Sequence, residues 1–523
     1  MQRMAMLAEL MRTANQIKNF TAGIVRYLLT SVVAFYTRRL FIDALGVEYL
    51  GVAGLMGNVL GMLAIAELGI GSSIVFSLYA PLARQDRNKV HLLIDLYRRL
   101  YIYIATFVCF LGLALMPFLT DISPDLANIP HYRWIYLLFL ANSVIPYFFA
   151  YNSTLYTASQ QDYKLQNIRT LFYILTTGAT ILILTYWPNY ILLTACTSAL
   201  GIASQLLIYI LAHRKWPWLH NKPEGKLPQE DIDIIKKNVR AMVLHKIGDY
   251  SINGTSNLII ANAVNLVTVG LLANYTVIVG MLKSILQQFF DAMIAGMGEL
   301  IAVSPKEKVQ LVFREMNFLA FWFYGLAMLG CYFCIDPVIR LWLGEGFELP
   351  RAAVFFMCFD LYIIGMRIPP NIVKSGAGMF SNDQYAPLFQ ALINLGIGIT
   401  LAHFWGVTGV TFSIMLSGLL VPCWFRPYVI YRDYFKISFI PYLLEYALYL
   451  CILALIFLLL AGVFTLYCPS APYMNAGYRI LCVMVVFHVV LFPISFCLPQ
   501  GRMAFSRLFR LLYPLFHKIC PNH

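Results

Sequence analysis

Residues 440–466 read IPYLLEYALYLCILALIFLLLAGVFTL, and Glu445 is the only charged residue among them. A helix needs about 20 predominantly apolar residues to cross the hydrocarbon core of a bilayer. Similar stretches recur along all 523 residues, of which 60% are hydrophobic and only 12% are charged. Soluble domains carry about 25% charged residues, so the sequence predicts a protein whose helices are surrounded by lipid.

Fourteen helices of membrane-spanning length are predicted from these stretches, which makes the expected fold class all-α and polytopic. Two pseudo-symmetric six-helix bundles followed by two C-terminal helices would account for all of them. The predicted spans are residues 19–42, 51–80, 96–118, 134–157, 170–187, 190–212, 241–263, 268–292, 317–339, 351–375, 388–405, 407–430, 440–466 and 477–498.

Basic residues between the spans predict the orientation of the chain. When the amino terminus is placed inside, Lys and Arg concentrate in the inner segments, and Arg84, Arg87 and Lys89 are examples. The outer segments hold only Arg38, Arg39, Arg133, Arg340, Arg351 and Arg479. Because positive charge favours the inner side of a membrane, both termini are expected in the cytoplasm.

An internal repeat and the loop lengths predict the domain organisation. Alignment of the first two spans with the seventh and eighth pairs Lys18 with Lys237, and residues 61–63 with 280–282, which are Gly-Met-Leu in both. Repeats in one orientation are typical of transporters whose substrate site lies between the halves. The expected parts are an N-terminal six-helix lobe at 1–212, a cytoplasmic linker with an amphipathic helix at 213–240, a C-terminal six-helix lobe at 241–430, two extra helices at 431–500 and a basic cytoplasmic tail at 501–523.

Polar residues inside the predicted spans are the candidate functional residues, because charge is costly in lipid and usually faces the bundle interior. The seventh span carries Lys246, Asp249, Asn253 and Asn257 on one helix face. We interpret this stripe as the wall of a hydrated cavity, and a structural seam between helices is the alternative. The repeat places Arg26 at a similar depth, and its alternative role is snorkelling to the inner headgroups.

Two sets of side chains follow as candidate sites. The substrate-binding set is Arg26, Lys246, Asp249, Asn253, Asn257, Lys283 and Arg367. The set for coupling to protons or sodium is Glu67, Asp249 and Asp360, and structural pairing is the alternative for each of them. The cationic members suit an anionic substrate.

Other function classes have little support in the sequence. No hydrolase, kinase or Walker pattern occurs, and the histidines lack metal-ligand spacing. Cys331 and Cys334 form a lone C-x-x-C pair inside an apolar run, which we interpret as core packing. The net charge of +13 follows from the topology, and no nucleic-acid motif accompanies it. We therefore expect a protein that is not an enzyme and has no metal, cofactor or nucleic-acid partner.

Several short stretches resemble one family of membrane transporters. Thr37–Leu40 (TRRL) and Leu45–Val52 (LGVEYLGV) resemble the first loop of the Wzx-like polysaccharide, or O-antigen, flippases. So do Ala66–Ser73 (AELGIGSS) and Ser77–Ala83 (SLYAPLA), while Val269–Tyr275 (VGLLANY) is similar to the family's loop into its eighth span. The family belongs to the multidrug/oligosaccharidyl-lipid/polysaccharide exporter superfamily, which also holds MATE exporters and lipid II flippases.

The resemblance implies a function and its partners. A member of this family would move an undecaprenyl-pyrophosphate-linked oligosaccharide from the inner to the outer leaflet of the bacterial cytoplasmic membrane by alternating access. Cell-surface polysaccharide, such as the O-antigen of lipopolysaccharide, would be the product of the pathway. The implied partners are the lipid-linked oligosaccharide, membrane lipids, protons or sodium, and other glycan-assembly proteins.

Three alternatives remain open at this stage. A MATE-like ion-coupled exporter of small molecules would keep the fold but would prefer acidic residues in its cavity. A membrane polysaccharide polymerase would need a larger outer loop than the short ones predicted here. A non-transporting scaffold would leave the polar stripe of the seventh span without a purpose.

Overall fold

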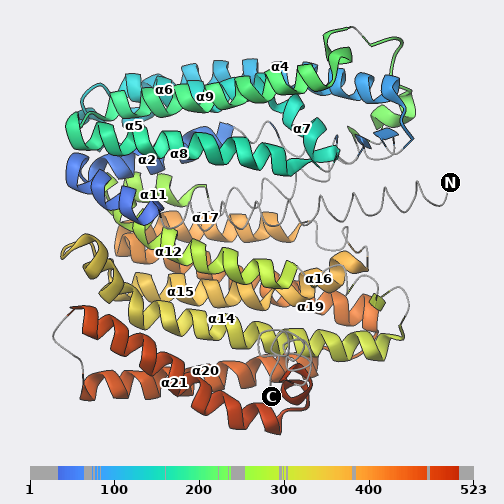
Figure 1. Cartoon of the computed structure of the whole chain (residues 1–523). Coiled ribbons are helices and arrows are strands. Elements are labelled where there is room, and N and C mark those ends of the chain that lie inside the picture. Colours follow the sequence, from blue (N-terminus) through green and yellow to red (C-terminus); the bar gives the residue numbers. More distant parts are fainter. Residues whose placement is uncertain are drawn as a thin grey trace, which may run out of the picture. The chain divides into compact units, whose positions relative to one another are not determined.

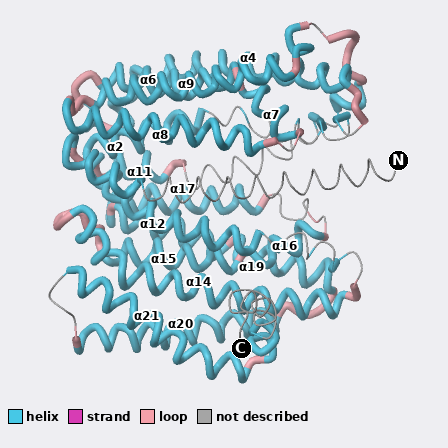
Figure 2. The backbone as a smooth tube through the Cα atoms, viewed as in Figure 1, coloured by secondary structure: helices cyan, strands magenta, loops and turns pink. Residues whose placement is uncertain are grey.

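All regular elements that the structure describes are helices. The computed structural model describes residues 33–63, 67, 74, 77–78, 81–82, 84–159, 161–221, 223–233, 235–236, 239, 254–291, 293, 297, 300–301, 304–377, 379, 385–467 and 472–505. Within these residues no strand occurs, and helices connected by short loops make up the chain (Figure 2). The predicted all-α fold class is confirmed.

The chain forms two compact units, Met1–Gly270 and Leu271–His523. The helices of the first unit are α2 (Val47–Leu63), α4 (Arg87–Leu115), α5 (Leu119–Ile122), α6 (Tyr132–Val144), α7 (Ala150–Ala158), α8 (Asp162–Tyr186), α9 (Tyr190–Lys215) and α11 (Ser256–Ala263), with short 3-10 turns η2 (Met116–Phe118), η3 (Pro124–Asn128), η4 (Ile145–Phe148) and η5 (Pro217–His220). Helices α4, α6, α8 and α9 lie side by side in this unit (Figure 1).

The second unit contains most of α12 (Leu266–Asp291) and all later helices. These are α14 (Lys306–Leu343), α15 (Arg351–Met366), α16 (Ile368–Gly376), α17 (Ala386–Trp405), α18 (Val407–Leu420), α19 (Pro422–Val429), the π-helical segment η6 (Ile430–Phe435), α20 (Ile440–Leu466) and α21 (Pro472–Cys497). Helix α14 packs against α15 on one side and against α21 on another (Figure 1).

Ten helices in the described part of the chain are long and apolar enough to cross a membrane, and two bent helix pairs raise the number to 12 if each pair is one span. The chain is therefore a multi-pass membrane protein. The predicted count of fourteen stays a prediction, because the first and seventh predicted spans lie mostly outside the described residues. The lobe and linker boundaries also stay predictions, although residues 229–233 of the expected amphipathic helix are helical.

The helices extend further than the apolar stretches that predicted them. The span expected at 96–118 begins at Arg87, and the span expected at 317–339 runs from Lys306 to Leu343. Hydropathy detects only the part of a helix that lipid surrounds, whereas charged turns continue the helix beyond it. Asp86 marks one such start, since its side chain accepts a hydrogen bond from the Lys89 backbone N–H at 3.0 Å and caps α4.

Glycines allow a sharp bend at one point of the first unit and a close helix contact at another. The chain bends by 115° between residues 33–45 and 47–63, at Gly46, whose φ of +90° favours glycine. Farther along α2, Gly51 faces the first turn of α12, and an added Cβ would lie 2.8 Å from the carbonyl carbon of Leu266. Small residues at such crossings let membrane helices approach closely.

A buried polar network fixes the helices that carry the candidate site in the second unit. The Tyr275 hydroxyl of α12 donates to Oδ1 of Asp336 in α14 at 2.8 Å. Arg351, the first residue of α15, donates from Nη1 to Oδ2 of the same carboxylate at 2.7 Å. Asp336 is only 9% exposed, so its hydrogen bonds hold α12, α14 and α15 together at one end.

Candidate functional site

The structure describes five of the nine candidate site residues. Arg26, Lys246, Asp249 and Asn253 lie outside the described residues, so their roles stay predictions. Glu67 and Asn257 lie in the first unit, and Lys283, Asp360 and Arg367 lie in the second. The second set comes from α12, α15 and the α15–α16 junction, which are distant in sequence.

Lys283 and Arg367 line the same cavity. Its volume is about 280 Å³, and its walls come from α12, α15, α16 and α19 of the second unit. The lining residues are Lys283, Gln287, Asp291, Ile364, Arg367, Ile368, Asn371, Ile372 and Arg426. We call it the cationic cavity, because three of these side chains are cations and one is a carboxylate.

Helix α12 supplies one wall of the cationic cavity. Lys283, Gln287 and Asp291 follow at intervals of four residues, which places them on one helix face. Gln287 donates from Nε2 to Oδ1 of Asp291 at 2.8 Å, so the amide group is already engaged. Within the described residues, the Lys283 ammonium lies within ion-pair distance of no carboxylate, although it interacts electrostatically with Asp360.

A break in the helix places Arg367 at the cavity. Arg367 follows the last residue of α15, and α16 resumes with Ile368, Pro369 and Pro370. Neither proline has a backbone N–H, so the ladder of hydrogen bonds is interrupted next to the arginine. Interrupted helices at membrane depth are tolerated where they line a cavity. Among the described residues, the Arg367 guanidinium makes no ion pair.

Asp360 lies next to Arg367 around a glycine of α18. A Cβ added to Gly418 would lie 3.3 Å from Asp360 Oδ1, 3.6 Å from Arg367 Nη1 and 3.7 Å from Gln390 Nε2. The absence of a side chain at Gly418 therefore leaves room for these three groups around it. The Asp360 carboxylate also interacts electrostatically with Lys283. The predicted residues Lys283, Asp360 and Arg367 thus belong to one neighbourhood.

Arg426 is a cavity residue that the sequence reasoning missed. It falls near the end of the span predicted at 407–430 and was counted with the basic residues of the inner segments, but it lies in α19 and lines the cavity. The stretch Pro422–Val429 (PCWFRPYV) is otherwise apolar and aromatic. A single cation within an otherwise apolar stretch is the sequence feature that could have identified Arg426 as a site residue.

The cavity can hold an anion. Arg and Lys bind phosphate and carboxylate groups through charge-assisted hydrogen bonds, and Arg does so with a planar fork of donors. The surrounding low-dielectric helices strengthen these interactions relative to water. Asn371 adds an amide group at the wall. The arrangement thus suits binding of a negatively charged group of phosphate size.

The two described candidates in the first unit have different surroundings. Glu67 accepts a hydrogen bond from the Tyr101 hydroxyl, and the Tyr101 ring lies 4.3 Å from that of Tyr97, centroid to centroid. Asn257 lies in α11, and its Nδ2 would be 3.5 Å from a Cβ added to Gly54 of α2. This contact resembles the helix seam that was the alternative for the polar stripe, and the functional roles of both residues stay predictions.

Comparison with solved structures identifies similar folds. The chain is similar to a structure titled lipid II flippase MurJ, inward closed conformation, with 12% identity, a TM-score of 0.64, and coverage of 90% of this chain and 98% of that one. It is also similar to a multidrug resistance MATE family transporter of the MOP superfamily in an inward-facing conformation, with 13% identity, a TM-score of 0.58, and coverage of 76% and 95%.

A third similar structure is that of a point mutant of the Vibrio cholerae MATE transporter VcmN, with 12% identity, a TM-score of 0.52, and coverage of 81% and 98%. No protein-family model matches the sequence, and no curated protein matches it either. At such low identity the likeness concerns the fold. The chain therefore has the fold of these flippase and multidrug transporter structures.

Proposed function

We propose that this protein moves an undecaprenyl-pyrophosphate-linked oligosaccharide from the inner to the outer leaflet of the bacterial cytoplasmic membrane by alternating access. The pathway it would serve is the synthesis of cell-surface polysaccharide. The cationic cavity carries the proposal, because Lys283, Arg367 and Arg426 surround one space inside a membrane-embedded unit. Likeness of fold to a structure titled as a lipid II flippase supports it.

The size of the cavity limits what it would hold. Its volume of about 280 Å³ corresponds to roughly nine water molecules at about 30 Å³ each. A pyrophosphate group would fit with part of its hydration, whereas an oligosaccharide would not. The cavity would therefore bind the charged head group, and the sugars would occupy other space.

The membrane potential would favour this direction of transport. Moving one charge across the field is worth about 2.3 kcal/mol per 100 mV. With the inside negative, two negative charges crossing outward would gain roughly 4–5 kcal/mol per 100 mV. Asp249, Asp360 and Glu67 are the residues that we propose for coupling to protons or sodium.

A MATE-like exporter of small cations is the second candidate. The carboxylates of Glu67, which accepts from the Tyr101 hydroxyl, and of Asp291, at the wall of the cationic cavity, would suit a positively charged substrate. Such an exporter would protect cells from cationic drugs, and a flippase would not. A drug-susceptibility panel on a deletion strain therefore separates the two candidates.

The test of the flippase is glycan export in a deletion strain that carries plasmid-borne variants. Lys283→Ala with Arg367→Ala is expected to abolish surface glycan while the protein level in the membrane is unchanged. Lys308→Ala is the matched control, because Lys308 is an exposed cation of the same unit outside the cavity. Normal export by the double variant would refute the assigned role of the cationic cavity.

A further inference from the structure

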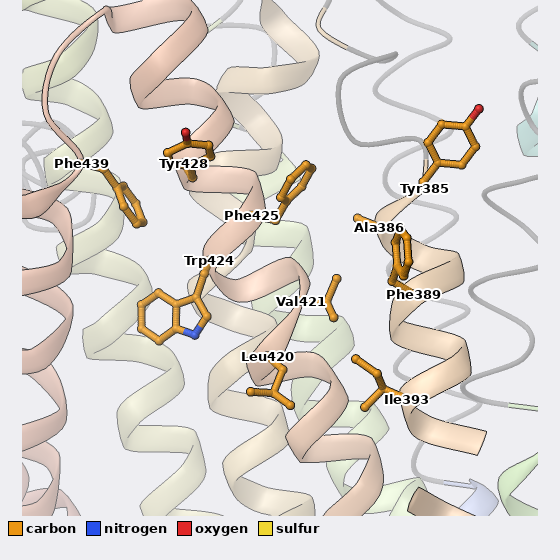
Figure 3. Close-up of a pocket in the computed structure, with 10 residues that line it drawn as sticks. All are labelled: Tyr385, Ala386, Phe389, Ile393, Leu420, Val421, Trp424, Phe425, Tyr428 and Phe439. Atoms are coloured by element: carbon orange, nitrogen blue, oxygen red, sulfur yellow. The ribbon is translucent and has the colours of Figure 1, made fainter. Parts of the chain in front are cut away.

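The second unit contains a larger cavity with aromatic walls. Its volume is about 660 Å³, within the range of about 300–1,000 Å³ that is usual for ligand sites. Phe389 and Ile393 of α17 lie across from residues of α18 and α19, and Phe439 lies beyond Trp424 (Figure 3). The aromatic members of this groove are Tyr385, Phe389, Trp424, Phe425, Tyr428 and Phe439. We call it the aromatic groove.

One short helix separates the aromatic groove from the cationic cavity. Helix α19 packs against both α16 and α17. Its Arg426 lines the cationic cavity, whereas Phe425 and Tyr428 of the same helix line the groove. Charged and aromatic side chains of one helix thus serve two adjacent sites.

Helix α17 divides the two environments in the same way. Gln390 is 7% exposed and approaches Gly418, where Asp360 and Arg367 also lie. The preceding residue, Phe389, is 59% exposed and lines the groove. Two consecutive residues of α17 therefore face the polar neighbourhood and the groove, so this helix also lies between them.

We propose that the aromatic groove holds isoprenoid units of the substrate's polyprenyl tail, which reach it around α19, while the pyrophosphate occupies the cationic cavity. This inference rests on the proposed function and names where the lipid part of the substrate would lie. An anionic head bonded to an apolar chain matches a cationic cavity and an apolar groove that lie on two sides of one short helix, α19. The exposed side chains of the groove leave it open to lipid, so the rest of the tail can remain in the bilayer.

The aromatic walls explain why an isoprenoid would be preferred to an ordinary acyl chain. Transfer of a chain from lipid into a groove gains little hydrophobic energy, so packing decides the preference. Flat, unsaturated and methyl-branched units present planar faces to the rings of Phe389, Phe425 and Tyr428. A flexible saturated chain would make fewer fixed contacts with these rings.

Photo-crosslinking of the full-length protein in lipid nanodiscs tests this placement. The probe is a polyprenyl pyrophosphate with a diazirine within its first few isoprenoid units, and a phosphatidylglycerol with a diazirine in its acyl chain is the comparison. Peptides that contain residues 385–393 and 420–428 are expected to be labelled by the first probe. Unlabelled polyprenyl pyrophosphate should compete, and an excess of phosphatidylglycerol should not.

Two neighbouring substitutions on α17 give a matched pair. Ile393→Trp fills the groove. It is expected to lower the apparent affinity of the probe, measured from the concentration dependence of labelling, about tenfold, which equals about 1.4 kcal/mol. Leu392→Trp adds the same side chain at a position that is 67% exposed and outside the groove, so labelling should stay unchanged. Equal labelling of both variants would overturn the proposal.

The remaining outcomes separate this inference from the proposed function. Labelling of the groove by phosphatidylglycerol as strongly as by the polyprenyl probe would make it a general lipid site and overturn the inference alone. Labelling of α12 or α16 without labelling of the groove would place the tail elsewhere and leave the proposed function standing. If unlabelled polyprenyl pyrophosphate reduces labelling by the polyprenyl probe nowhere on the chain, both this inference and the proposed function fail.

Discussion

The close contact between Gly365 of α15 and Tyr324 of α14 predicts that a larger residue at position 365 destabilises the protein. A Cβ added to Gly365 would lie 2.5 Å from Cδ1 of the Tyr324 ring. Carbon atoms in good contact lie about 3.5–4.0 Å apart, and the Cγ atom of the ring is nearer still, so the two helices would have to separate by more than about 1 Å at this point. Overpacking of this kind costs about 1–3 kcal/mol, and we expect Gly365→Ala to lower the free energy of unfolding by that amount.

A double-mutant cycle makes the physical cause testable. Tyr324 is fully buried, so Tyr324→Ala alone should cost about 3–5 kcal/mol through the cavity it leaves. In the double variant the added methyl group meets no ring, and the combined loss should be smaller than the sum of the two single losses. The expected coupling is about 1–3 kcal/mol.

The assay is equilibrium unfolding in mixed detergent micelles, followed by tryptophan fluorescence. Gly396→Ala on α17 is the control, because nothing lies within 4 Å of an added Cβ there. That variant should be neutral or more stable by about 0.5–1 kcal/mol, since alanine favours the helix. Strict additivity of Gly365→Ala and Tyr324→Ala would refute the steric reasoning.

Two further predictions concern stability. Gly51→Ala should destabilise the first unit by about 1–3 kcal/mol, because its Cβ would clash with the Leu266 backbone. Gly57→Ala on the same helix is the control, because its Cβ would enter open space and should not destabilise the unit. Equal stability of the two variants would contradict this reasoning. Partial burial raises the pKa of Glu348, but hydrogen bonds from Arg340 and from the backbone of its loop outweigh it and hold the pKa below its usual range. Stability from this carboxylate is therefore present above the usual pKa of about 4.3 and lost as pH falls through the lower folded value. Thermal unfolding between about pH 5 and pH 3 should consequently be less pH-dependent in Glu348→Gln, and an unchanged profile would count against the assignment.

The sequence predicted the helices well because lipid imposes a simple rule on them. A spanning helix must be long and apolar, so hydropathy alone located the described spans from α4 onward, the seventh predicted span apart, to within a few residues at most ends. The charged turns at Arg87 and Lys306 were missed, because those turns continue the helix outside the lipid. The sharp bend at Gly46 falls between the first two predicted spans, as their boundaries imply.

The candidate site was predictable only in part. Lys283, Asp360 and Arg367 were identified one by one, since a charge inside a predicted span is unusual wherever it occurs. That Lys283 and Arg367 line one cavity depends on α12 and the α15–α16 junction lying on opposite sides of it, and no local pattern contains that information. Arg426 was missed because it falls near the end of the span predicted at 407–430 and was counted with the basic residues of the inner segments.

Binding of a lipid pyrophosphate is the most direct test of the claim that the cationic cavity receives an anionic head group. Native mass spectrometry or microscale thermophoresis of the purified full-length chain would compare a short polyprenyl pyrophosphate with the uncharged alcohol of the same length. The pyrophosphate should bind at least about tenfold more tightly, and Arg367→Glu should remove that preference while Lys308→Glu keeps it. Equal binding of the two lipids, or a preference that survives Arg367→Glu, would contradict the account.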